Sequence, residues 1–301
     1  MAFNPIPEPI TQPTDASASV QPPAQARPLI GELFAEAGRV TEHDIKRVIV
    51  LQRRKGLRFG EAARSLGLVS DEDIQRALAR QFNYVYIRRG ESGLHPMLVT
   101  GYQPFSAAAE AFRMLRGQLM LRWFNQGNKT LAVGGPRSGT GCSTLVANLA
   151  VSFAQLGERT LLLDANFRNP AQHLLFGLSA EVGLADVLLG RSSVEQAIVT
   201  IAQLNGLAVL PAGPMPPNPH ELLSSRALQY LLDLAKEVYD VILLDTAPVL
   251  DYADAQMIAA RTYGYMMVTR RHRTRLSDVR AAQERLAPSA ASLLGTVVND
   301  E

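Results

Sequence analysis

A glycine-rich segment near the middle of the chain has the composition of a phosphate-binding loop. The segment GGPRSGTGCST spans residues 134–144 and is followed by the apolar run LVANLAVSFAQLG. Gly139 and Gly141 let the backbone curl so that successive N–H groups converge at the start of a helix, where they form an anion-binding nest. Ser143 stands where such loops place a hydroxyl ligand of Mg²⁺. The residues expected to contact a nucleotide are Gly139, Thr140, Gly141, Cys142, Ser143 and Thr144.

Two aspartates each follow an apolar run that is typical of a strand. The carboxylate in LLLDANFRNP is Asp164, and the one in VILLDTAPVL is Asp245. Ligands of an open α/β sheet bind beside the carboxyl ends of its strands, so both carboxylates are placed to hold Mg²⁺ or its waters. Each aspartate alone is equally well explained as the N-cap of a following helix. The order of the three segments favours function, and the expected metal ligands are Ser143, Asp164 and Asp245.

A parallel sheet is needed to bring these segments together. From Lys129 onward, strand-like and helical runs alternate, a pattern typical of a parallel sheet with helices on both faces. The candidate strands are apolar throughout, as expected for buried parallel strands. They cover residues 130–133, 160–163, 207–210, 241–244, 266–268 and 295–298. The predicted fold class is α/β, with a P-loop NTPase domain of mostly parallel sheet over residues 106–301.

The N-terminal part of the chain contains an internal repeat. IGELFAEAGRVTEHDIKRVIVLQ aligns with FGEAARSLGLVSDEDIQRALARQ at a spacing of 29 residues. Each copy predicts a short helix ended by glycine, then a capping box and a second helix. We expect a small helical tandem-repeat domain over residues 27–86. Residues 1–26, rich in Pro, Ala, Ser and Gln, are expected to be disordered, and residues 87–105 are expected to form a linker.

Composition excludes several classes of protein. The 301 residues include 30 basic and 28 acidic side chains, a net charge of +2 that gives no support to nucleic-acid or polybasic membrane binding. The single cysteine, Cys142, excludes an internal disulfide framework and a cysteine-clustered zinc site. No apolar run reaches the roughly 18 residues of a membrane span, and the N-terminus lacks the order of a signal peptide. We therefore expect a cytoplasmic protein that binds no nucleic acid.

A charged series lies on the helix predicted over residues 107–125. Glu110, Arg113 and Arg116 are three residues apart in EAFRMLR and share one side of that helix. A solvated charged face explains most such series, but this one resembles the ExxRxxR motif that contributes to ring contacts in bacterial tyrosine kinases. With the glycine loop and both aspartate segments, it makes the domain similar to the tyrosine kinases of capsule and exopolysaccharide systems, relatives of MinD- and ParA-type ATPases. The EpsG-type members of that family also carry an N-terminal repeat domain.

The resemblance implies a protein that binds ATP or ADP with Mg²⁺ and assembles into a homo-oligomer. It implies that Asp164, Asn166 and Asp245 form the catalytic group. It also implies that Asn299 contacts the nucleotide base and that Arg137 stands where ParA- and MinD-type loops carry a signature lysine. Arg137 is equally well explained as a solvent-facing side chain. The implied partner is an inner-membrane chain-length determinant of the Wzz type, and membrane association, peripheral at the inner membrane, would occur only through it.

Three departures from the family pattern affect catalysis. The lysine that stabilises the charge developed in phosphoryl transfer normally stands between Gly141 and Ser143, where this chain has Cys142. None of the four lysines of the chain lies in the loop. Asn166 replaces the second aspartate of the DxDxR segment and cannot neutralise metal charge. The C-terminal tyrosine cluster is missing, because all eight tyrosines lie at or before Tyr265.

These departures predict a nucleotide-binding regulator of exopolysaccharide synthesis and chain length whose tyrosine kinase activity is weak or lost. An active ATP-dependent tyrosine autokinase is the alternative. The third hypothesis is a cyclic di-GMP receptor that acts through the repeat domain, and it rests on the repeat motif.

The repeat motif resembles the MshEN-type N-terminal domain of type II secretion and type IV pilus assembly ATPases. Some members of that family bind cyclic di-GMP, with an arginine before the apolar residue and glycine that open each copy. Arg58 holds that position in copy two, whereas copy one has Leu29. An arginine can stack on guanine or pair with phosphate. The candidate contacts of cyclic di-GMP are Arg58, Gly60, Gly31, Gly67 and Gly38. The other interpretation is a pair of helical hairpins that only packs on itself and binds no ligand.

Overall fold

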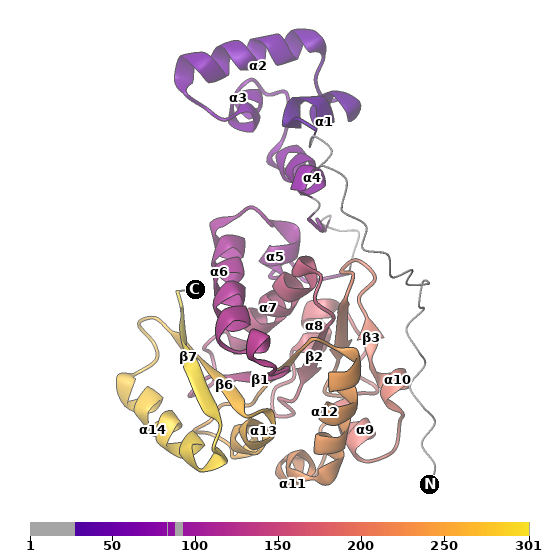
Figure 1. Cartoon of the computed structure of the whole chain (residues 1–301), viewed down its shortest axis with the longest axis vertical. Coiled ribbons are helices and arrows are strands. Elements are labelled where there is room, and N and C mark those ends of the chain that lie inside the picture. The colour runs from indigo at the N-terminus through magenta and orange to yellow at the C-terminus, as the bar shows by residue number, and fades with distance from the viewer. Residues whose placement is uncertain (1–27, 83, 88–92, 301) are drawn as a thin grey trace. The chain divides into compact units, whose positions relative to one another are not determined.

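The computed structural model describes residues 28–82, 84–87 and 93–300, and it divides between Tyr84 and Val85 into two compact units (Figure 1). The tail predicted to be disordered, residues 1–26, lies outside the described residues. Among the helices of the described ranges, none combines the length and the apolarity needed to cross a bilayer.

Four helices make up the N-terminal unit: α1 (Ile30–Glu36), α2 (Glu42–Lys55), α3 (Phe59–Ser65) and α4 (Asp71–Phe82). α1 packs against α4 and α3 packs against α2, so the first helix of each repeat copy rests on the second helix of the other copy. Both copies contribute to one core, which includes Phe34 and Val48 from copy one and Ala62 and Val69 from copy two. The repeat therefore builds a single interlocked unit rather than two independent hairpins.

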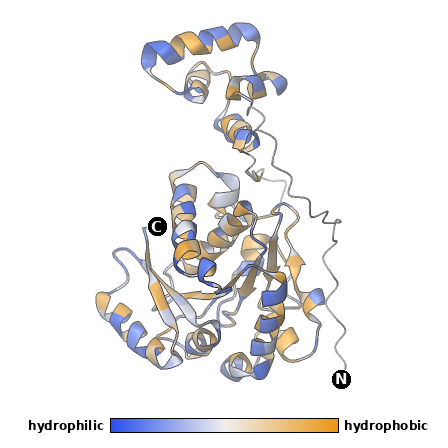
Figure 2. Cartoon of the chain, in the orientation of Figure 1, coloured by the Kyte–Doolittle hydropathy of each residue, from blue (hydrophilic) through white to orange (hydrophobic). Residues whose placement is uncertain are grey.

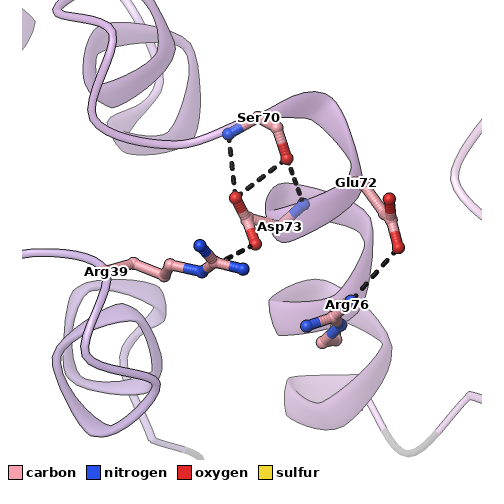
Figure 3. A network of polar contacts seen from close by, with 5 residues as sticks. All are labelled: Arg39, Ser70, Glu72, Asp73 and Arg76. Carbon is pink, nitrogen blue, oxygen red and sulfur yellow. Dashed lines mark hydrogen bonds and ion pairs between the residues drawn. The ribbon is translucent and has the colours of Figure 1, made fainter.

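Matching capping boxes begin the second helix of each copy. Thr41 accepts the N–H of Asp44 at 3.2 Å, and Ser70 accepts the N–H of Asp73 at 3.1 Å. Asp73 also pairs with Arg39, at 3.1 Å, from the turn between α1 and α2 (Figure 3). An N-cap of this kind stabilises a helix by about 1 kcal/mol. The Arg39–Asp73 ion pair thus joins copy one to the cap of copy two.

A seven-stranded sheet forms the centre of the C-terminal unit, in the order β3-β4-β2-β5-β1-β6-β7. Its strands are β1 (Thr130–Gly134), β2 (Thr160–Asp164), β3 (Val199–Thr200), β4 (Leu207–Leu210), β5 (Val241–Asp245), β6 (Gly264–Arg270) and β7 (Ser292–Asn299). All neighbouring pairs are parallel except β3 and β4. The predicted α/β class with a mostly parallel sheet is confirmed, and only the two-residue edge strand β3 was not predicted.

Side chains of the central strands alternate between two cores, one on each face of the sheet. In β1, Leu131 and Val133 belong to the core that includes α6 (Ala107–Arg122) and α7 (Cys142–Leu156). Ala132 belongs to the other core, which includes α12 (Arg226–Val238), α13 (Asp254–Thr262) and α14 (Leu276–Leu286). The strands are accordingly hydrophobic, while the covering helices carry both kinds of residue (Figure 2). The short elements are α5 (Val99–Tyr102), η1 (Phe124–Gln126), α8 (Gln172–Phe176), α9 (Leu184–Leu188), α10 (Val194–Ala197), α11 (Pro219–Ser224) and η2 (Ala287–Ser289).

Over residue 87 and residues 93–105, the part of its range that the structure describes, the linker prediction for residues 87–105 is wrong. Ile87, Leu94 and Leu98 are buried in the core on the α7 face of the sheet. The backbone N–H of Thr100, in α5, donates to Oδ1 of Asn148 in α7 at 3.0 Å. Isolated apolar residues among turn formers have no helical or strand period, so the sequence pattern did not reveal that they join this core.

Candidate nucleotide-binding site

The glycine-rich loop joins β1 to α7 at the carboxyl edge of the sheet. Gly139 and Gly141 have φ of +83° and +78°, the left-handed region that favours glycine. α7 begins at Cys142, directly after Gly141, so the unpaired N–H groups of its first turn adjoin the loop. A helix N-terminus preceded by a curled glycine loop is suited to binding phosphate.

Asp164 and Asp245 end the adjacent strands β2 and β5 as register partners, and both are fully buried. Asp164 accepts the backbone N–H groups of Ala171 and Gln172, each at 2.9 Å. Burial raises the pKa of Asp164 to about 8, and the charge of Asp245 adds to this effect. Burial also raises the pKa of Asp245 to about 6, while hydrogen bonds, first that of Ser143, oppose the rise. Two buried neighbouring carboxylates repel each other, and a divalent cation offsets that repulsion.

Cys142 faces Asp245 across the site. Its Sγ lies 3.6 Å from Oδ1 of Asp245, so the thiol donates a weak hydrogen bond to the carboxylate. Burial, together with the charge of Asp245, raises the pKa of this thiol well above its ordinary value. The thiol is therefore neutral, and the position where P-loops carry a lysine presents no positive charge.

Gln172, at the start of α8, is a central residue of the site that sequence reasoning missed. It is fully buried, and its Nε2 donates to Oδ2 of Asp245 at 2.7 Å and to the carbonyl of Ser143 at 3.1 Å. A polar residue at the start of a short apolar helix, soon after the Asp164 segment, was the only available indication in the sequence. Its partners come from two other elements, which no local pattern predicts.

Asn166 stabilises the turn that follows β2. It is largely buried, its N–H donates to Oδ1 of Asp164 at 3.2 Å, and its Oδ1 accepts the N–H of Asn169 at 3.2 Å. Arg168, two residues on, pairs with buried Asp254 at 2.9 Å and lies 4.6 Å from the ring centroid of Tyr252. The segment after β2 is thus fixed by its own side chains.

Asn299, the predicted base contact, lies next to the glycine-rich loop, whereas Arg137 pairs with carboxylates elsewhere. Asn299, at the end of β7, donates from Nδ2 to the carbonyl of Thr140 at 3.1 Å and so lies on the loop. Arg270, its register partner in β6, donates to the carbonyl of Gly139 at 3.4 Å and was not predicted. Arg137 instead pairs with two carboxylates outside the predicted metal ligands, Asp251 at 3.1 Å and Asp278 at 3.3 Å.

The charged series of α6 makes contacts within its own chain. Nε of Arg113 donates to Glu110 at 2.8 Å, and Nη1 of the same arginine donates to the carbonyl of Pro104. Arg116 donates to the carbonyl of Ser152 in α7 at 2.6 Å. Glu110 keeps 58 % of its side chain exposed. Part of the series therefore holds α6 on α7, and Glu110 remains accessible.

The repeat unit contains a cavity of about 340 Å³. Arg58 and Gly60 line it with Phe59, Arg64 and Gln81 of copy two and Ile30 of copy one. Gly31, Gly38 and Gly67 are not among its lining residues. Gly38 and Gly67 have φ of +65° and +69° and end α1 and α3, a role that requires no ligand.

The fold and the loop define an α/β nucleotide-binding domain of the P-loop class, and residues 128–272 match the family described as an AAA domain. Tyrosine-protein kinase YwqD of Bacillus subtilis (strain 168) is 39% identical over 197 residues, which cover 65% of this chain and 83% of that protein. This chain belongs to the bacterial tyrosine-protein kinase family.

Two further relatives show how far the similarity extends. Putative tyrosine-protein kinase EpsB of Ralstonia solanacearum is 37% identical over 196 residues, which cover 65% of this chain but only 26% of EpsB. The solved kinase domain of Escherichia coli tyrosine kinase ETK is 29% identical, with a TM-score of 0.66 over 70% of this chain and 82% of that domain.

Proposed function

We propose that this chain is a nucleotide-binding regulator of exopolysaccharide synthesis and chain length whose own kinase turnover is weak or lost. The observation that carries the proposal is the neutral Cys142 thiol, 3.6 Å from Asp245, at the position of the P-loop lysine. Removing one electrostatic stabiliser of a transition state costs about 3–4 kcal/mol, a factor of 10² to 10³ in turnover.

The parts that bind nucleotide are retained in this proposal. The amide nest of residues 139–144 would hold phosphate, and Asn299, next to the loop, would contact the base. Ser143, Asp164 and Asp245 offer a hydroxyl and two carboxylates, hard oxygen donors of the kind Mg²⁺ prefers. Within the described ranges, no group of three or more His, Cys, Asp and Glu side chains is arranged to hold a metal alone. This donor set fits Mg²⁺, which is commonly bound by one or two carboxylates together with substrate phosphates.

In this proposal, the chain differs from other P-loop enzymes in turnover. When bound, Mg²⁺ would neutralise phosphate charge, but the ammonium that shares this task in P-loop enzymes is replaced by a thiol. Arg137 is held by Asp251 and Asp278, and Asn166 contributes no negative charge to the metal site. Release of ADP by the purified protein tests this point. We expect a rate no higher than that of Asp245→Ala, whereas a rate that disappears in Asp245→Ala supports the active autokinase.

The proposed partners are a second copy of the chain and a Wzz-type chain-length determinant of the inner membrane. Self-assembly would use the α6 series Glu110, Arg113 and Arg116. Met114 and Leu121 of the same helix are 62 % and 67 % exposed, which supports a contact with another protein surface. The EpsG-type arrangement of a repeat domain before the kinase-like domain fits this role, and recruitment would be peripheral, through the partner.

A second candidate function is cyclic di-GMP binding by the MshEN-like repeat unit. The cavity of about 340 Å³ favours it through Arg58, because a guanidinium group binds phosphate and stacks on guanine. Arg64, also in the lining, pairs with Asp71 of the same cavity. Calorimetry with cyclic di-GMP tests it directly. Heat from the intact protein that is lost in Arg58→Ala is expected, and the absence of heat rejects this function.

A further inference from the structure

One buried residue, Gln172, hydrogen-bonds to every residue that is predicted to bind the metal. The backbone N–H of Gln172 donates to Oδ2 of Asp164 at 2.9 Å. Its side-chain Nε2 donates to Oδ2 of Asp245 at 2.7 Å and to the carbonyl of Ser143 at 3.1 Å. These three partners come from β2, β5 and the start of α7, so Gln172 joins the three segments that must converge on the cation.

The orientation of the Gln172 amide follows from its partners. The Ser143 carbonyl can only accept a hydrogen bond, so the nitrogen must face it and the oxygen must face the other way. Oε1 is buried, and among the described residues it has no hydrogen-bond donor. A buried acceptor without a donor is unfavourable unless a bound water or ligand supplies one.

We propose that Gln172 is a positioning residue of the magnesium site, in which Nε2 fixes the Asp245 carboxylate beside Ser143 while the backbone N–H of the same residue fixes Asp164. This inference rests on the proposed function, since it requires that the site binds nucleotide with Mg²⁺. An amide suits the position because it supplies a donor and an acceptor without adding charge. A third carboxylate there would increase the repulsion between Asp164 and Asp245.

Titration calorimetry with ADP, in MgCl₂ and separately in EDTA, tests the inference. In the wild type we expect ADP to bind more tightly with Mg²⁺ than without it. Gln172→Met keeps the shape but removes the amide, and it should reduce this gain about tenfold or more, the usual effect of losing a group that orients metal ligands. The affinity in EDTA should stay close to that of the wild type.

Gln155→Met is the matched control. Gln155 lies near the far end of α7, where its Nε2 donates to the carbonyl of Thr100 at 3.0 Å, and its Oε1 is also buried without a donor among the described residues. The same change at Gln155 should leave the magnesium gain unaltered. An unaltered gain in Gln172→Met overturns the inference alone, whereas a wild type that binds no ADP, or binds it equally in EDTA, overturns the proposed function as well.

A second variant separates metal binding from folding. Gln172→Glu places a carboxylate beside Asp245 and should lower the melting temperature in EDTA. If residue 172 adjoins the cation, Mg²⁺ with ADP should then raise the melting temperature of Gln172→Glu more than that of the wild type. An equal or smaller rise contradicts the proposal.

Discussion

Sγ of Cys142 lies 3.6 Å from Oδ1 of Asp245, so a neutral thiol contacts the carboxylate that a P-loop enzyme uses at its metal. The contact occurs at the first residue of α7, where loops of this class carry the lysine that stabilises phosphoryl transfer. The proposed function therefore separates nucleotide binding from nucleotide turnover. Backbone amides and carboxylates would serve the first, and the missing ammonium would limit the second.

Restoring the lysine should restore turnover. Cys142→Lys supplies an ammonium beside the phosphate nest, and we expect ADP release to rise about 10²-fold over the wild type. Cys142→Ser, which stays neutral, is the matched control and should leave the rate unchanged. If ADP release does not rise in Cys142→Lys but rises when this change is combined with Asn166→Asp, both positions account for the lost turnover. No rise in either variant would contradict the account of a lapsed kinase.

The buried carboxylates should make stability depend on pH. The pKa of Asp164 is raised from 3.8 to about 8, so the folded protein keeps a proton that the unfolded chain has already released. Stability should thus fall as pH rises between about 4 and about 8. Melting temperatures measured in EDTA should show this fall in the wild type and a weaker one in Asp164→Asn. Mg²⁺ with ADP should flatten the wild-type curve, and the same slope in all three cases would contradict the electrostatic description of the site.

The two repeat copies should differ in ligand binding. If cyclic di-GMP binds, Arg58→Ala should weaken it about tenfold or more, because a hydrogen bond from a charged group contributes about 1.5–3 kcal/mol. Arg54→Ala, on the exposed last turn of α2, removes the same charge away from the cavity and should have no effect. Leu29→Arg, which gives copy one the residue of copy two, should tighten binding. Calorimetry on the three variants measures their affinity for cyclic di-GMP. Equal affinities would show that the cavity does not bind it.

Replacing Glu110 should weaken self-assembly while leaving the stability of the fold nearly unchanged. Glu110→Arg changes an exposed side chain and should alter the free energy of unfolding by less than about 0.5 kcal/mol while lowering the mass of the assembly in light scattering. Arg116→Ala removes the bond to the Ser152 carbonyl and should cost about 1–3 kcal/mol of stability. An assembly mass unaffected by Glu110→Arg would exclude this face of α6 as the contact.

The sequence was most informative where local patterns determine the structure. Asp164 and Asp245 were predicted to share one edge of the sheet because each ends an apolar run, and they are register partners in β2 and β5. Gln172 was missed because its importance depends on Ser143 and Asp245, which come from other elements. The pairing of Arg137 with Asp251 and Asp278 likewise joins residues more than a hundred positions apart, and no spacing rule predicts it.

The linker error has a different physical origin. Ile87, Leu94 and Leu98 are separated by turn formers, so they show no period, yet each is buried on the α7 face of the sheet. Local sequence patterns also do not predict that the two repeat copies interlock. The capping boxes at Thr41 and Ser70 predict where the helices begin, but not that α1 packs against α4 of the other copy.

Titration of the intact protein with ATP and Mg²⁺ in a calorimeter tests the central claim most directly, because it reports binding and turnover together. The account predicts a saturable heat of binding that returns to baseline after each injection, with both the heat and its magnesium dependence reduced in Asp245→Ala. A sustained heat of hydrolysis after saturation, or no saturable heat at all, would contradict it.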